Sequence, residues 1–215
     1  AINTGLGQAT ILFAIKPQAM DEVVPLYKSL IQPGQLVLSI AAGTPIAYFE
    51  HHLGPNTGVV RAMPNTPASI GRGITVLCAN SHVTAEQRTR CEVLIGAVGQ
   101  VEWIEDEPLM DAVTAVSGSG PAYVFLLIEA LAKAGIDAGL DADLANHLAL
   151  TTAVGAGALA EQSQDSPAVL RQNVTSPGGT TAAALEVLMG DNGLEQLMTR
   201  GVAAAKKRGQ ELSKV

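Results

Sequence analysis

The 215-residue sequence lacks an excess of positive charge, a long uninterrupted apolar run and a secretory leader pattern. Its formal net charge is −7, which argues against nucleic acid as the main partner because a nucleic-acid-binding domain needs a basic surface. No apolar run approaches the ~20 residues needed to span a bilayer. The first residues show no basic stretch followed by an apolar core, as a signal peptide would. We therefore expect a soluble, cytoplasmic protein.

Cysteine is also scarce, and Cys78 and Cys91 make neither a disulfide framework nor a zinc-ligand spacing. We expect both to be reduced and to act as small buried apolar groups. The histidines show no metal-ligand spacing with carboxylates or cysteines, so the sequence predicts no metal site and surface positions for them: His51, His52, His82 and His147. With 47% hydrophobic residues, the chain can bury one good core or two modest ones.

The segment Asn173–Thr181 is the most informative motif, and it runs straight into the helical pattern of residues 182–188. Its two glycines let the backbone approach a ligand, and the first turn of the following helix has N–H groups without intrahelical partners. These features indicate an anion site that suits a small carboxylate. An ordinary capped helix after a Ser-Pro turn fits the same residues, because Ser and Thr are also common N-cap residues.

A second glycine-serine segment, Ser117–Tyr123, precedes the apolar run Val124–Ile128. Pro121 favours the start of a helix there. Together with Asn173–Thr181, this segment is a candidate wall of a polar pocket. The alternative is a flexible connector, which a Ser-Gly-Ser-Gly run also suits.

The first half of the chain alternates short apolar runs with loops and helical stretches, which predicts an open α/β sheet. Strands are expected at residues 10–15, 36–40, 58–63, 73–79 and 100–104, and helices at 18–31, 45–53 and 84–97. Open α/β sheets bind ligands at the carboxyl ends of their strands. We therefore expect Ala14–Pro17, Ala41–Gly43 and Met63–Thr66 to share one edge.

The second half changes character near residues 105–108, and from there on the sequence predicts helices alone. The expected helices are residues 108–116, 122–134, 141–161, 167–173, 180–189 and 194–212. Segment 141–161 is rich in Ala and Gly, which lets helices pack closely. The helical half completes its core either within the chain or against a second copy. The fold class is therefore α/β followed by all-α, with domains at residues 1–105 and 106–215.

Five blocks of the sequence resemble the pyrroline-5-carboxylate reductase family in order and spacing: Lys16–Gln18, Ala41–Gly43, Arg61–Pro67, Asp111–Tyr123 and Val174–Thr181. The resemblance runs from about Thr10 to the C-terminus. It implies reduction of 1-pyrroline-5-carboxylate to L-proline with NADPH or NADH, the last step of proline biosynthesis. It also implies that residues 1–105 form a partial Rossmann domain and that residues 106–215 interleave in a homodimer, often a building block of larger rings.

The resemblance further implies roles for individual residues. The substrate would contact Glu107, Ser176, Gly178, Gly179, Thr180 and Thr181, and the hydroxyl of Thr181 would reach the ring nitrogen as the catalytic group. The cofactor would contact Ala14, Ile15, Lys16, Pro17, Ala41, Ala42, Gly43, Asn65 and Asn173. Helix capping is the alternative for Thr181 and Glu107, a helix end for Asn173, and ordinary strand-to-helix turns for the remaining cofactor residues.

The chain departs from the family at its start. Family members begin with a strand, a Gly-rich phosphate-binding turn and a helix, and Gly5–Gly7 does not replace them because no strand leads into it. We therefore expect about 60 residues of a full reductase to be missing and cofactor binding to be weak in this polypeptide. Two other functions stay open: a related imine or 2-hydroxyacid oxidoreductase, and a non-catalytic dimer that keeps only a carboxylate pocket.

Overall fold

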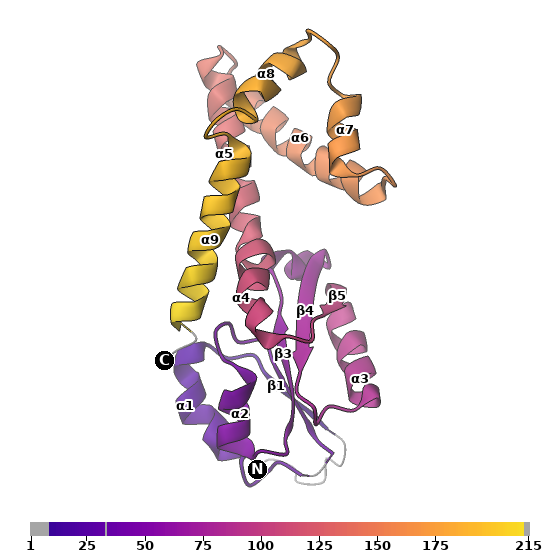
Figure 1. Ribbon diagram of the computed structural model, residues 1–215, viewed down its shortest axis with the longest axis vertical. Helices are drawn as coiled ribbons and strands as arrows, with labels where there is room; N and C mark the ends of the chain where they lie inside the picture. The colour runs from indigo at the N-terminus through magenta and orange to yellow at the C-terminus, as the bar shows by residue number, and fades with distance from the viewer. Residues whose placement is uncertain (1–8, 33, 213–215) are drawn as a thin grey trace. The chain divides into compact units, whose positions relative to one another are not determined.

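The computed structural model describes residues 9–32 and 34–212, so Gly5–Gly7 lies outside the described residues. The chain divides into two compact units. The first comprises Ala1–Pro121 with Val202–Val215, and the second comprises Ala122–Gly201. Figure 1 shows the sheet in the first unit and helices alone in the second.

The first unit is built on a five-stranded sheet in the order β1-β2-β3-β4-β5. The strands are β1 (Thr10–Phe13), β2 (Leu36–Ser39), β3 (Gly58–Met63), β4 (Gly73–Ala79) and β5 (Gly99–Trp103). Strands β1, β2 and β3 are parallel, β4 is antiparallel to β3, and β5 is parallel to β4. The predicted α/β sheet is confirmed, and it is mixed. Strand β4 reverses because residues 64–72 are fewer than the dozen or so that a parallel crossover needs.

The predicted helix over residues 18–31 is wrong as a continuous element. The segment is divided into the 3₁₀ turn η1 (Pro17–Ala19), the helix α1 (Met20–Val23) and the 3₁₀ turn η2 (Val24–Tyr27). Proline has no backbone N–H and its ring clashes with the carbonyl four residues earlier, so Pro25 stops the α-helical ladder after Val23. Strand β1 likewise ends at Phe13, two residues earlier than expected.

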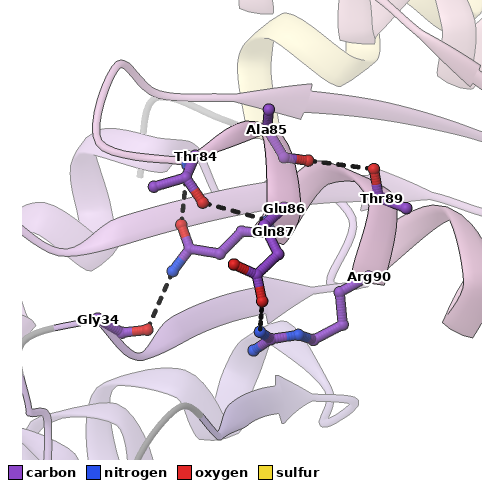
Figure 2. A network of polar contacts seen from close by, with 7 residues as sticks. All are labelled: Gly34, Thr84, Ala85, Glu86, Gln87, Thr89 and Arg90. Atoms are coloured by element: carbon purple, nitrogen blue, oxygen red, sulfur yellow. Dashed lines mark hydrogen bonds and ion pairs between the residues drawn. The ribbon is translucent and has the colours of Figure 1, made fainter.

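Helix α3 (Ala85–Gly96) begins with a capping box. The N–H of Gln87 donates to Thr84 Oγ1 at 3.2 Å, and the N–H of Thr84 donates to Gln87 Oε1 at 2.9 Å. The amide of Gln87 also donates to the Gly34 carbonyl at 3.1 Å, as Figure 2 shows. The cap therefore fixes the first turn of α3 and ties it to the segment that leads into β2.

Both faces of the central strands β2, β3 and β4 are buried. Helix α2 (Ile46–Leu53), α1 and α4 (Met110–Val113) contribute to a core on one face with Val37 and Phe49, while α3 packs on the other face against Leu36 and Leu38 (Figure 1). Successive strand residues alternate between these two cores, as expected for strands covered on both sides. Cys78 and Cys91 are buried free thiols, as predicted.

Helical turns run through residues 107–137 with a bend at Ser119, so Ser117–Tyr123 is not a flexible connector, and the helix start predicted near Pro121 is confirmed. The segment contains η4 (Glu107–Leu109), α4, the π-helical turn η5 (Thr114–Gly118) and α5 (Gly120–Asp137). A Cβ on Gly118 would lie 2.6 Å from Cε of Met63. Gly118 therefore permits close packing of the helix against the end of β3 instead of forming a flexible loop.

Among the described residues, one helical segment is long and apolar enough to cross a membrane by length and composition alone. It spans Glu107–Asp137, and 11% of the apolar 18-residue stretch within it is buried inside the structure. This differs from the expectation that no segment approaches that length. A subunit interface also uses such a segment, because exposed apolar side chains can be covered by another protein subunit as well as by lipid.

The second unit consists of helices in the part of it that the structure describes. They are α5 from Ala122 onward, α6 (Ala142–Gln162), α7 (Pro167–Asn173), α8 (Thr180–Leu188) and the start of α9 (Leu194–Leu212). The bounds of α7 and α9 are those predicted. Within residues 122–201 the hydrophobic side chains that are fully buried are alanines: Ala132, Ala145 and Ala149. Large apolar residues such as Phe125 and Val154 are exposed.

Candidate functional site

The carboxyl ends of β1, β2 and β3 meet at one edge of the sheet. In register, Phe13 pairs with Ser39, and Ser39 pairs with Arg61. The segments that follow these strands therefore share this edge, as predicted, and they contain most of the expected cofactor residues. After β1, Ala14, Lys16 and Pro17 are exposed and Ile15 packs against the core; after β2, Ala41 is buried and Ala42 is exposed.

Hydrogen bonds between backbone N–H groups and side-chain oxygens hold two of these segments in place. The Ala41 N–H donates to Ser39 Oγ at 3.3 Å, and Gly43 has a left-handed φ of 77° with no atom within 4 Å of an added Cβ. The Ile74 N–H donates to Asn65 Oδ1 at 3.0 Å. One oxygen of Asn65 therefore binds the start of β4, while the turn at Gly43 leaves open space beside the backbone.

Glu107 has two partners within the first unit. Its Oε1 accepts hydrogen bonds from Arg61 Nη1 at 3.0 Å and from the Ile46 N–H at 2.9 Å. The predicted alternative was capping of its own helix, whereas Glu107 caps α2, which begins 61 residues earlier. The sequence analysis did not identify Arg61 as a candidate functional residue. A charged residue inside the apolar run of β3 is the sequence feature that could have indicated it.

The loop between α7 and α8 is a tight turn in the second unit. The Gly179 N–H donates to the Ser176 carbonyl at 3.0 Å, with Pro177 and Gly178 between them. Gly178 has a φ of 69°. Proline followed by a left-handed glycine is the sequence of a type II turn. The turn therefore fixes the direction in which the chain enters α8.

A second pair of hydrogen bonds joins this turn to α7. The Thr175 hydroxyl donates to the Arg171 carbonyl at 2.6 Å, and the Thr175 N–H donates to the Gln172 carbonyl at 2.9 Å. Arg171 Nη1 contacts Sδ of Met189 at 3.4 Å, next to the end of α8. The sequence motif predicted the turn, but it did not predict the contacts of Arg171 and Thr175 that hold the turn.

Helix α8 starts at this turn without a side-chain cap. Its N-cap residue is Gly179, whose own N–H is used by the turn, and no side chain accepts a hydrogen bond from the first helical turn. The capped-helix alternative for Thr181 therefore does not apply. The first-turn N–H groups of Thr180, Thr181 and Ala182 have no intrahelical acceptors. Together with the helix dipole they favour a negatively charged ligand. Asn173 is the last residue of α7 and is exposed.

A family model and the sequences of known proteins both resemble this chain, and they point to the same family. A family model described as pyrroline-5-carboxylate reductase dimerisation matches residues 107–212. Pyrroline-5-carboxylate reductase of Pseudomonas aeruginosa is 46% identical over 203 residues, which cover 94% of this chain and 74% of the relative. The corresponding protein of Synechocystis is 44% identical and covers 95% of this chain and 75% of the relative.

Solved structures agree with the sequence relatives. The pyrroline-5-carboxylate reductase of Coxiella burnetii has a TM-score of 0.91 and 40% identity, covering 96% of this chain and 76% of that chain. The Plasmodium falciparum pyrroline carboxylate reductase, solved with NADP bound, has a TM-score of 0.84 and 32% identity, covering 95% and 77%. The chain belongs to the pyrroline-5-carboxylate reductase family.

Proposed function

We propose that the protein reduces 1-pyrroline-5-carboxylate to L-proline by hydride transfer from NADPH or NADH. The observation that carries the proposal is the uncapped N-terminus of α8 behind a fixed turn, which suits the substrate carboxylate. The names of the relatives support the reaction. The alternatives of a 2-hydroxyacid oxidoreductase and a non-catalytic carboxylate-binding protein have no comparable support.

The substrate carboxylate is assigned to the loop of Ser176, Gly178, Gly179, Thr180 and Thr181. The N–H groups of Thr180 and Thr181 are available, whereas that of Gly179 closes the turn. Gly179 contributes by lacking a side chain, because a Cβ there would lie 3.1 Å from the Ser176 carbonyl oxygen. The loop therefore recognises the carboxylate mainly through its backbone and the helix dipole.

Thr181 is assigned as the catalytic residue. The support for this assignment is its position in the first turn of α8, next to the proposed carboxylate-binding N–H groups, from which its hydroxyl would reach the nitrogen of a small ring. A cyclic imine can bind already protonated, so Thr181 orients the nitrogen and stabilises its proton while positioning supplies most of the rate enhancement.

The cofactor, which supplies the hydride to the imine carbon, fits the strand edge of the first unit. The segments Ala14–Pro17 and Ala41–Gly43 lie at the carboxyl ends of parallel strands, where open α/β sheets bind nucleotides. The open space at Gly43 lets a ligand approach the backbone. Asn65, which follows β3, is a further proposed cofactor contact in this unit. Asn173 belongs to the second unit, and its cofactor contact is proposed from the family resemblance alone.

The helical region mediates self-association, in agreement with the dimerisation family model for residues 107–212. Part of the proposal is that the homodimers assemble further into rings and that the exposed apolar side chains of α5 face another subunit and not lipid. We also propose a cytoplasmic location. Separation of a cell lysate into membrane and supernatant fractions, followed by gel filtration of the supernatant, tests location and assembly together.

The reaction is tested by following NAD(P)H oxidation with 1-pyrroline-5-carboxylate, using the protein in its full natural length. Thr181→Val should lower kcat about tenfold, the equivalent of one lost hydrogen bond. Thr151→Val, a change of an exposed threonine in α6, is the matched control and should leave kcat unchanged. Absence of turnover in the unaltered protein with both NADPH and NADH would refute the proposed reaction.

A further inference from the structure

Arg61 is a buried cation in the apolar core of the sheet unit. Its side chain is 6% exposed. In register it lies between Ser39 on β2 and Cys78 on β4, which places it on the face that Cys78 shares with Phe49 and Met110. A buried guanidinium is costly unless it is paired. Among the described residues its ionic partner is Glu107, at 3.0 Å.

Glu107 uses the same oxygen to cap α2. The residue at the N-cap of α2 is Pro45, which offers no side-chain acceptor. Glu107 Oε1 takes over this function by accepting the hydrogen bond of the Ile46 N–H at 2.9 Å. Ile46 follows directly on the loop that contains Ala41–Gly43, so this hydrogen bond fixes the point at which that loop enters the helix.

The ion pair joins three segments that are far apart in the sequence. Arg61 belongs to β3, Ile46 begins α2, and Glu107 is the first residue of the region that matches the dimerisation family model. All three lie in the same compact unit. One carboxylate oxygen of Glu107, Oε1, is therefore used for contacts within this unit.

We propose that Arg61 and Glu107 are positioning residues for the nucleotide loop: Arg61 orients the Glu107 carboxylate, which holds the start of α2 and thereby the backbone of Ala41–Gly43. The assignment of that loop to the cofactor rests on the proposed function. The contact between the ion pair and α2 does not, and the two can therefore be tested separately.

The first test measures hydrogen exchange of the backbone amides and needs no cofactor. Arg61→Met keeps much of the side-chain volume and removes the charge. In this variant the amides of residues 41–44 and of Ile46 should exchange about 3- to 30-fold faster, the range expected when a helix cap is weakened; Pro45 has no amide hydrogen. Amides of α3, on the other face of the sheet, should keep their protection. Unchanged exchange at residues 41–46 would overturn the proposal.

The second test separates positioning from substrate contact. In Arg61→Met and in Glu107→Gln, the dissociation constant of NADPH, measured by its fluorescence, should rise by about the same factor as the exchange rates. The KM for 1-pyrroline-5-carboxylate at saturating NADPH should change less than about twofold. A raised substrate KM with unchanged NADPH binding would instead mean that Glu107 touches the substrate. Loss of thermal stability with both constants unchanged would reduce the pair to a structural contact.

The exposed ion pair of Arg88 and Glu105 provides the matched control. It has the same N–O distance of 3.0 Å, but the Glu105 side chain is 77% exposed. Arg88→Met and Glu105→Gln should leave both the exchange of residues 41–46 and NADPH binding unchanged. If they shift NADPH binding as much as Arg61→Met does, the effect is one of general charge, and the assignment to Arg61 fails.

Discussion

Gly178→Ala tests whether the turn before α8 binds the substrate. Gly178 has a left-handed φ of 69°, and no atom lies within 4 Å of an added Cβ. The substitution therefore introduces no collision and leaves only the backbone penalty, which is about 1–2 kcal/mol for a residue with a side chain. At about 1.4 kcal/mol per factor of ten, the population of the native turn falls about 5- to 30-fold relative to relaxed conformations.

The lower population of the native turn should change the kinetic constant that reports substrate binding, KM for 1-pyrroline-5-carboxylate. If the turn must form before the carboxylate binds, KM for 1-pyrroline-5-carboxylate rises by up to about 5- to 30-fold, while kcat at saturation and KM for NAD(P)H change little. Initial rates of NAD(P)H oxidation, measured with each reactant varied in turn, give both constants. Gly43→Ala, at a φ of 77° with similar open space, should show the opposite pattern and raise KM for NAD(P)H.

Gly71→Ala is the control because it has nearly the same geometry outside both proposed loops. Its φ is 70°, and an added Cβ meets nothing within 4 Å. It should lower stability by a similar amount and leave both KM values unchanged. If Gly178→Ala behaves like Gly71→Ala, the turn does not bind the carboxylate and the assignment of the substrate to this loop is wrong.

Three further predictions concern the sheet unit. Asn80→Ala removes four hydrogen bonds made by one carboxamide and should lower the free energy of unfolding in urea by about 2–4 kcal/mol without changing either KM. The hydrogen bond from Arg88 lowers the pKa of Glu105. The unaltered protein should therefore be more stable to unfolding than Glu105→Gln above the unfolded pKa of the carboxyl group, near 4.3, and this difference should disappear as the pH falls through the folded pKa. A stability difference that grows in acid would contradict this. Burial raises the pKa of the Cys91 thiol to about 11 and also raises that of Cys78, so a thiol reagent at pH 8 should label both only after denaturation.

Elements whose signals are local could be predicted from the sequence. Helix α7 has the predicted bounds because Ser166 caps it and Pro167 occupies its first position. The turn at Pro177 and Gly178 is also local, since it is fixed by two adjacent residues. This is why the most informative motif in the sequence coincides with a hydrogen-bonded turn in the structure.

Features that depend on distant partners could not be predicted. Ser117–Tyr123 has the composition of a loop, yet it is helical because Gly118 lets the chain pack against Met63. The contact between Arg61 and Glu107 spans 46 residues, and no local pattern indicates it. The Glu107 position was identified through the family resemblance, which implies a substrate contact; that contact stays a prediction, while its contacts with Arg61 and Ile46 are seen only in the structure.

The helical unit cannot complete its core with its own described residues. The sheet unit fully buries large side chains such as Phe49 and Leu77, whereas residues 122–201 bury only alanines and expose Phe125 at 64%. Burying one large apolar side chain contributes about 1.5–3 kcal/mol, so a partner subunit supplies much of the stability of this unit. The turn before α8 is held by hydrogen bonds to α7, which belongs to the same unit. We therefore expect self-association to stabilise the frame on which the proposed carboxylate site depends, so that assembly and substrate binding are coupled.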